Sequence, residues 1–283
     1  MRPESVGLEK SGHESIGAPS SRQYGSYVTT VVSVHSFRGG TGKSNTTSNV
    51  AANLAALGHR VGVIDCDIQS PGIHVLFGFD ETLDRTLNDY LWGTRAIGDV
   101  AHDITGRVAM STAVSPGGSL HLVPSSMKPG DIARILRDGY DVESLREGMR
   151  QLARDLDLDF LFVDTHPGLN EETLLSITLS DVLLLILRPD RQDYQGTAVT
   201  VDIARRLEVP ALFLVANKVP AGLTDIRAQL DAAYGAETIA VLPLSEEVVV
   251  NASGGLFSLL HPEHPWSEQV RGIADRLHAG VSA

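Results

Sequence analysis

The feature that most constrains this chain of 283 residues is a glycine-rich stretch, Phe-Arg-Gly-Gly-Thr-Gly-Lys-Ser, at residues 37–44. It follows an apolar run that predicts a strand at residues 28–36 and precedes a run that predicts a helix at residues 45–57. Glycines let backbone N–H groups turn toward an anion, and the N-terminus of a helix adds partial positive charge. This order of strand, loop and helix predicts a binding site for the phosphates of a nucleotide.

Two side chains at the end of the loop suit phosphate and metal chemistry. The Lys43 ammonium can reach β- and γ-phosphate oxygens, and the Ser44 hydroxyl can ligate Mg²⁺. The usual pattern places a glycine five residues before Gly42, but here that residue is Phe37. Instead, the basic Arg38 directly precedes Gly-Gly-x-Gly-Lys-Ser, so the loop is a variant of the usual phosphate-binding pattern.

That variant resembles the loop of the MinD/ParA family of P-loop ATPases. In the family the basic residue is a signature lysine that crosses to the partner's nucleotide in a dimer, and the resemblance implies this role for Arg38. A solvated loop arginine is the alternative. The resemblance also implies that the ligands are ATP and Mg²⁺. The residues expected around the phosphates are Gly39, Gly40, Thr41, Gly42, Lys43, Ser44 and Asn45.

Acidic residues end two further runs that predict strands. Asp65 and Asp67 follow residues 60–64, and Asp164 follows residues 160–163. Ligands of parallel α/β sheets bind at these strand ends, where paired carboxylates can face Mg²⁺ and a water molecule. The resemblance implies that Asp67 orients the hydrolytic water, with Asp65 nearer the metal and Asp164 holding Mg²⁺ through water. Helix capping is the alternative role for such an aspartate.

Two residues beside these carboxylates admit more than one interpretation. His166 stands where members of the family have proline or another small residue, and it could sense the γ-phosphate or lie exposed in a loop. Cys66 lies between Asp65 and Asp67, on the opposite face of the strand by the period-2 rule. We predict that Cys66 packs as a small apolar residue.

A further buried-strand pattern, at residues 211–216, ends in Asn217 and Lys218. It resembles the base-recognition segment of the family. An asparagine amide offers both a donor and an acceptor to adenine, and a lysine stem can cover the ring. By the same resemblance, Pro243 would cover the other face of the adenine.

Composition and patterning predict an α/β fold: a doubly wound, mostly parallel central sheet flanked by helices. We assign residues 27–283 to a P-loop ATPase domain and residues 1–26, which are rich in serine and glycine, to a disordered tail. Residues 80–118 are long for a connection and contain helix-like pieces at residues 83–92 and 97–104. This segment is the expected site of specialisation.

The cysteine count and the hydropathy of the sequence limit the kinds of relative and the cellular location that we expect. The single cysteine argues against relatives that hold iron–sulfur clusters between subunits, because those relatives need paired cysteines. No apolar run is long enough to cross a bilayer, and the N-terminus lacks the layout of a signal peptide, so we expect a cytoplasmic protein.

The leading functional hypothesis is a Mg-ATP-dependent ATPase switch that forms a homodimer with ATP sandwiched between its subunits. As the resemblance implies, it would position or partition a cargo such as a chromosome, plasmid, division site or organelle-like complex, with slow hydrolysis stimulated by an activator protein. A weakly hydrolysing scaffold that dimerises on ATP is the main alternative. A kinase-like or ligase-like relative on the same fold is a third.

Charge and apolar patterning bear on the surface that such a switch would bind. The net charge of −12 weakens the case for nonspecific DNA, although several arginines could still cluster. These are Arg205, Arg206, Arg227, Arg271 and Arg276. The helical stripe Trp266, Val270, Ile273 and Leu277 coincides with the expected last helix of the fold, which favours internal packing over membrane binding.

Overall fold

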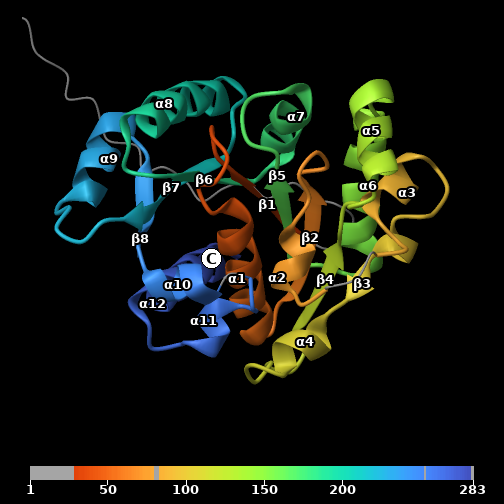
Figure 1. The fold of residues 1–283 in the computed structure, drawn as a ribbon, viewed down its shortest axis with the longest axis horizontal. Helices are drawn as coiled ribbons and strands as arrows, with labels where there is room; N and C mark the ends of the chain where they lie inside the picture. The colour runs from red at the N-terminus through yellow and green to blue at the C-terminus, as the bar shows by residue number, and fades with distance from the viewer. Residues whose placement is uncertain (1–28, 80–82, 252, 282–283) are drawn as a thin grey trace, which may run out of the picture.

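The structure, a computed structural model, describes residues 29–79, 83–251 and 253–281. The tail expected at residues 1–26 lies outside these ranges. The described residues form an eight-stranded sheet of order β3-β4-β2-β5-β1-β6-β7-β8, in which only β3 and β4 pair antiparallel (Figure 1). The strands are β1 (Thr30–His35), β2 (Arg60–Cys66), β3 (His102–Asp103), β4 (Ser119–Val123), β5 (Phe160–Thr165), β6 (Val182–Leu187), β7 (Ala211–Val219) and β8 (Glu237–Pro243).

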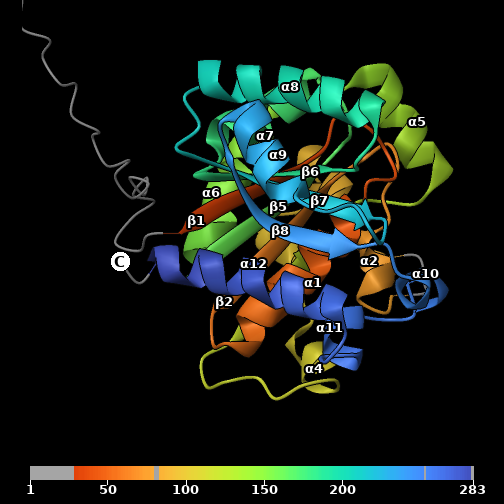
Figure 2. The same cartoon turned by 90° about the vertical axis from the view of Figure 1, so that its left-hand side faces the viewer.

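Helices cover both faces of the sheet, so the predicted doubly wound α/β fold is confirmed (Figure 2). One face carries α1 (Lys43–Ala56), α11 (Phe257–Leu260) and α12 (Pro265–Val281). The other carries α6 (Val142–Asp155), α7 (Glu171–Leu179), α8 (Arg191–Arg206) and α9 (Ile226–Tyr234). The remaining helices are α2 (Ile73–Leu76), α3 (Leu87–Leu91), α4 (Thr105–Ala109), α5 (Pro129–Asp138) and α10 (Glu246–Asn251).

The central strands are apolar on both faces, as buried parallel strands are. In β1, Val32 and Val34 pack in the cluster that contains α1 and α12, whereas Val31 packs in the cluster of α6. Every residue of β5 and β6 is buried. The two layers of helices therefore fix which way each strand's polar end residues point at the carboxyl edge.

The segment at residues 80–118 differs in part from expectation. Its first helix-like piece contains α3, but the prediction of a helix at residues 97–104 was wrong. That stretch is a 3₁₀ turn, Gly98–Val100, followed by the two-residue strand β3, which pairs with β4 at the sheet edge. Such a short strand has too few residues to show a period of two.

The apolar stripe of α12 packs inside the protein, as expected. Trp266, Val270, Ile273 and Leu277 are all buried in the core cluster that contains α1. Within the described ranges, no helix combines the length and apolar character needed to cross a membrane.

Candidate nucleotide-binding site

The glycine-rich loop joins β1 to α1 at the carboxyl edge of the sheet. Its backbone is left-handed at Gly40 (φ 74°) and Gly42 (φ 96°), a conformation that favours glycine. A Cβ at Gly42 would also lie 2.3 Å from Asn217 Nδ2, so no side chain fits there. Helix α1 begins immediately afterwards at Lys43, which leaves the N–H groups of its first turn available to an anion. The predicted phosphate residues Gly39, Gly40, Thr41, Gly42, Lys43, Ser44 and Asn45 thus form one loop-to-helix junction.

Hydroxyl and carboxylate groups meet beside this junction. Ser44 Oγ donates to Asp164 Oδ2 at 2.6 Å, and Thr47 Oγ1 donates to Asp164 Oδ1 at 3.3 Å. Asp65 lies directly opposite Asp164 in the register of β2 and β5. Asp65 Oδ1 accepts from the backbone N–H of Asp67, but its buried Oδ2 has no hydrogen-bond partner among the described residues. The three predicted metal residues, Ser44, Asp65 and Asp164, therefore converge.

Both buried carboxyls hold protons more tightly than usual. Burial raises the pKa of Asp164 to about 6, against the opposing effect of the Lys43 ammonium and the Ser44 hydroxyl. Burial, together with the charges of Asp164 and Asp67, raises the pKa of Asp65 well above its ordinary range. A cation at this point would offset the repulsion between the Asp65 and Asp164 carboxylates and would give Asp65 Oδ2 a partner.

These oxygen donors fit Mg²⁺, a hard cation that prefers carboxylate, hydroxyl, water and phosphate ligands. The described residues contain no group of three or more His, Cys, Asp or Glu side chains arranged to hold a metal ion. Mg²⁺ in nucleotide sites uses only one or two carboxylates and takes its other ligands from phosphates and water. The corner of Ser44, Asp65 and Asp164 suits a metal that arrives with its nucleotide.

The structure places Asp67 against His166. Asp67 is the first residue after β2, and His166 is the first residue after β5. His166 Nδ1 donates to Asp67 Oδ1 at 2.6 Å. Glu172, in the first turn of α7, lies close to both: burial raises its pKa, which His166 lowers and Asp67 raises. The sequence suggested a γ-phosphate sensor or an exposed loop residue at position 166 and gave no sign of this contact.

A pocket of about 230 Å³ lies beside the phosphate loop. It is lined by the predicted base-binding residues Asn217, Lys218 and Pro243 together with Gly42 and Asn45. The rest of the lining was not predicted from the sequence and comes from the segment after β8 and from α12. These residues are Leu244, Ser245, Val248, Val249, Ser253 and Trp266.

Asn217 and Lys218 also brace the phosphate loop from the side of the pocket. Asn217 Nδ2 donates to the carbonyl of Thr41 at 2.8 Å, and its Oδ1 accepts from the backbone N–H of Lys218. Lys218, in the left-handed region at φ 56°, donates from Nζ to the carbonyl of Gly40 at 2.8 Å. An amide has two hydrogens and two lone pairs, so one of each remains on Asn217 for a base.

Arg38 faces α8 of its own chain. Its Nη1 donates to Gln192 and lies 3.9 Å from Asp190 and 4.0 Å from Asp193. The preceding residue, Phe37, packs its ring directly over Gly196, where a Cβ would come within 2.1 Å of the ring. The phenylalanine that departs from the usual phosphate-loop pattern thus anchors the start of the loop on α8.

His35, the last residue of β1, was not singled out by the sequence. Its Nδ1 donates to Thr165 Oγ1 at 2.8 Å, and Thr165 Oγ1 in turn donates to the carbonyl of Val34 at 2.9 Å. Burial and the nearby Lys43 ammonium lower the His35 pKa to about 3, so the ring is neutral at pH 7. This contact ties the end of β5 to the start of the phosphate loop.

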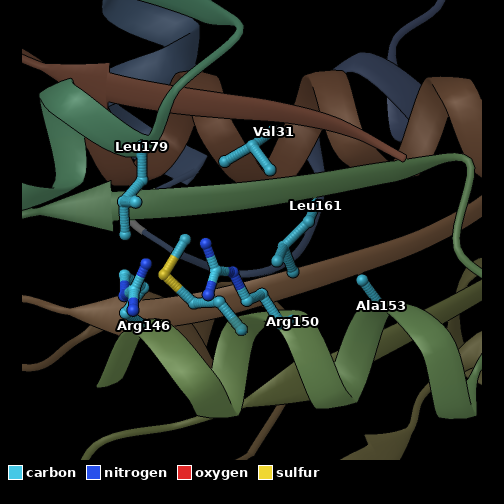
Figure 3. Close-up of a pocket in the computed structure, with 7 residues that line it drawn as sticks. Val31, Arg146, Arg150, Ala153, Leu161 and Leu179 are labelled. Carbon is cyan, nitrogen blue, oxygen red and sulfur yellow. The ribbon is translucent and has the colours of Figure 1, made fainter. Parts of the chain in front are cut away.

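A second cavity, between α6 and the sheet, is too small to compete as a ligand site (Figure 3). It measures about 10 Å³, scarcely room for one water molecule. Its lining includes Val31 and Leu161, near the starts of β1 and β5, so it lies away from the carboxyl edge.

The fold and the loop together define a P-loop nucleotide-binding protein. A model of the ParA family, described as an NUBPL iron-transfer P-loop NTPase, matches residues 27–278. The chain belongs to this family. The resemblance to MinD/ParA proteins seen in the sequence is thereby confirmed, and membership supports nucleotide hydrolysis in general.

Curated relatives carry different descriptions. An uncharacterized ATP-binding protein of Methanocaldococcus jannaschii is 25% identical over 87% of this chain and 86% of its own length. An iron-sulfur cluster carrier protein of Pyrococcus furiosus is 29% identical over 66% of this chain, and the match covers 60% of that protein. One of Methanococcus maripaludis is 30% identical over 66% of this chain and 59% of its own length. The chain thus spans about three fifths of these two carrier proteins.

Solved structures of similar fold are cell-division and partition ATPases. The MinD cell division protein of Aquifex aeolicus superposes with a TM-score of 0.74 at 18% identity, over 89% of this chain and 97% of its own. MinD of Pyrococcus horikoshii, complexed with Mg-ADP, superposes with a TM-score of 0.73 at 19% identity, over 90% of this chain and 99% of its own. At sequence identities of 18–19%, these superpositions show a shared fold and nothing more.

Proposed function

We propose that the chain is a Mg-ATP-dependent ATPase switch of the MinD/ParA type. The observation that carries the proposal is the convergence of Ser44, Asp65 and Asp164 beside Lys43 at the start of α1. The adjoining pocket of about 230 Å³ supplies a place for a base next to the place for its phosphates. ATP bound in this way spans the site from Asn217 to Asp164.

Each group has a defined task in this proposal. Loop N–H groups and the Lys43 ammonium bind the phosphates. Ser44, Asp164 and Asp65 would hold Mg²⁺, which supplies neutralisation of the charge that develops on the phosphates. Asp67 orients the attacking water, whose oxygen bonds to the γ-phosphorus while the bond to the β,γ-bridging oxygen breaks. ADP leaves with that electron pair, and the water's proton passes to a carboxylate or phosphate oxygen.

We further propose that two ATP-loaded chains close face to face, with Arg38 of each reaching the nucleotide of the other. Opposed polyphosphates repel each other, and a cation from each side would offset that repulsion. Arg38 must leave Asp193 of its own α8, and Asp190 just before that helix, to make the crossing. The dimer would then recruit an activator protein and a cargo in the cytoplasm.

The arginines offer little support for nonspecific DNA as the surface that the dimer binds. Each of the five considered in the sequence has an internal partner: Arg205 with the carbonyls of Tyr234 and Gly235, Arg206 with Asp202, Arg227 with the carbonyl of Thr238, Arg271 with the carbonyl of Pro262, and Arg276 with Glu237. The net charge of −12 likewise favours a partner other than the DNA backbone, such as an activator protein.

Two other functions remain as candidates. The departures from the family's pattern at Arg38 and His166 leave room for a weakly hydrolysing scaffold that dimerises on ATP. The cluster-carrying role in the names of some relatives finds less support, because Cys66 is the one cysteine of these 283 residues and lies buried in the core. A symmetric dimer would supply two buried thiols, whereas clusters bind four ligands.

Binding of a fluorescent ATP analogue with Mg²⁺ tests the proposal. Lys43→Ala should weaken binding by about 10- to 100-fold, because a charge-assisted contact is worth about 1.5–3 kcal/mol. Lys128→Ala, at an exposed position before α5, is the matched control and should bind as the wild type does. Equal affinity in the Lys43→Ala and Lys128→Ala chains would refute the phosphate-loop interpretation.

A further inference from the structure

The contact between His166 and Asp67 follows from the pairing of β2 with β5. The last pair of the register is Cys66 opposite Thr165, so the next residue on each chain segment is Asp67 and His166. They are 99 residues apart in sequence and 2.6 Å apart between Oδ1 and Nδ1. Both side chains are largely buried, with 12% of the Asp67 side chain and 22% of the His166 side chain exposed.

Both ends of this contact are fixed by their backbones. The N–H of Asp67 donates to Asp65 Oδ1 at 3.1 Å, and the carbonyl of His166 accepts from Thr173 Oγ1 at 3.2 Å. A carboxylate can only accept, so His166 Nδ1 carries the hydrogen. The hydrogen bond therefore restricts rotation of the Asp67 carboxylate, and its second oxygen, Oδ2, takes no hydrogen bond from the described part of the chain.

We propose that His166 is a positioning residue, which holds Asp67 through Oδ1 so that Oδ2 is presented to the water that attacks the γ-phosphate. The inference rests on the ATPase function proposed above. Charge-assisted hydrogen bonds are short and directional, so they set the angle of a carboxylate as well as its place. The same contact joins the loop after β2 to the loop after β5, so the two loops around the γ-phosphate adopt one arrangement together.

A set of variants in the full chain tests this role through kcat and KM for Mg-ATP hydrolysis. His166→Ala should lower kcat by about 10- to 100-fold, by analogy with the loss seen when an outer group that orients a metal-ligating side chain is removed. KM and the affinity for the ATP analogue should change by less than about twofold, because the His166 ring is hydrogen bonded to Asp67 and not assigned to the phosphates. His166→Asn, which keeps an N–H donor near the position of Nδ1, should restore most of kcat.

A double-mutant comparison separates positioning from simple support of the loop. In an Asp67→Ala background, His166→Ala should cause no further loss of kcat, because the group it orients is gone. His261→Ala, at an exposed histidine before α12, controls for histidine removal and should keep the wild-type rate.

Several outcomes would overturn the proposal. If His166→Ala hydrolyses ATP with the wild-type kcat, the positioning role is wrong, but the ATPase function still stands because the wild type hydrolyses ATP. A further loss of kcat when His166→Ala is added to Asp67→Ala would also overturn the positioning role. A rise in kcat would show instead that His166 restrains Asp67. If His166→Ala does not fold, a kcat in His166→Asn as low as that of Asp67→Ala overturns it as well. Binding of the ATP analogue without any hydrolysis by the wild type would overturn this proposal and the ATPase function together and leave the scaffold.

Discussion

The two halves of the glycine-rich loop are built differently. The second half, at Gly42, Lys43 and Ser44, is largely buried and already arranged: the Lys43 residue is 6% exposed and Ser44 is hydrogen bonded to Asp164. Together with the neighbouring carboxylates Asp65, Asp67 and Asp164, we call it the arranged half. The first half rests on α8, where Phe37 packs on Gly196 and the Arg38 side chain is 39% exposed. In the proposed switch, nucleotide binding within one subunit therefore starts from side chains already in place, whereas a contact by Arg38 with a second subunit requires its contacts with α8 to break.

The largest expected effect concerns chemistry at the arranged half. Asp67→Ala should keep the affinity for ATP but lower hydrolysis by about 100-fold or more, the contribution typical of a group that activates or orients a reacting water. Phosphate release and bound nucleotide should be measured on the same samples. Wild-type hydrolysis in this variant would mean that the arranged half lacks the carboxylate we assign to it.

A smaller effect is expected at the half that rests on α8. Arg38→Ala should leave ATP binding by the monomer within about twofold of wild type but weaken dimerisation by about 30-fold, the cost of losing one charged partner in a closed interface. Arg38→Lys should retain part of the dimer because it keeps the charge. Light scattering with Mg-ATP measures both. If Arg38→Ala instead loses ATP affinity as Lys43→Ala is expected to, the first half of the loop takes part in nucleotide binding within one subunit and not only in dimerisation.

The raised pKa of Asp164 predicts a pH dependence confined to the arranged half. Its carboxyl has a pKa of about 6 in the fold, above its ordinary value, so the metal-free fold gains stability as pH falls through about 6. Mg²⁺ requires the deprotonated carboxylate, so the stabilisation by Mg²⁺ should shrink over the same range. Thermal melts with Mg²⁺ or with a chelator at about pH 5 and about pH 7.5 test this. Asp164→Asn should remove the part of the difference that Asp164 contributes, and Asp65, whose pKa is also raised, should retain the rest.

The smallest effect concerns the packing of the Phe37 ring on Gly196. Gly196→Ala puts a methyl group where the ring lies, so the ring must move at a cost of about 1–3 kcal/mol in the free energy of unfolding. Gly272→Ala is the matched control, because a Cβ there meets no atom within 4 Å and alanine favours a helix. Urea unfolding compares the two. Equal stability would show that the first half of the loop does not depend on α8.

Local pattern was enough to predict the loop and the strands on either side of the site, but not the two-residue strand β3. The runs at residues 60–64 and 160–163 predicted β2 and β5, and the acidic residues lie at the strand ends that parallel pairing requires. Pattern could not predict contacts created by packing. The hydrogen bond from His166 to Asp67 depends on the register of β2 and β5. The packing of Phe37 on Gly196 depends on where α8 crosses the loop. Neither leaves a periodic signal in the sequence.

Sedimentation velocity of the Asp67→Ala chain is the most direct test of the switch, because slow hydrolysis should preserve the ATP state. With Mg-ATP, we expect a rise from the monomer mass of 30.3 kDa to twice that value, while Mg-ADP and nucleotide-free samples stay at the monomer mass. A chain that remains monomeric with saturating Mg-ATP, or that dimerises equally without nucleotide, would contradict it.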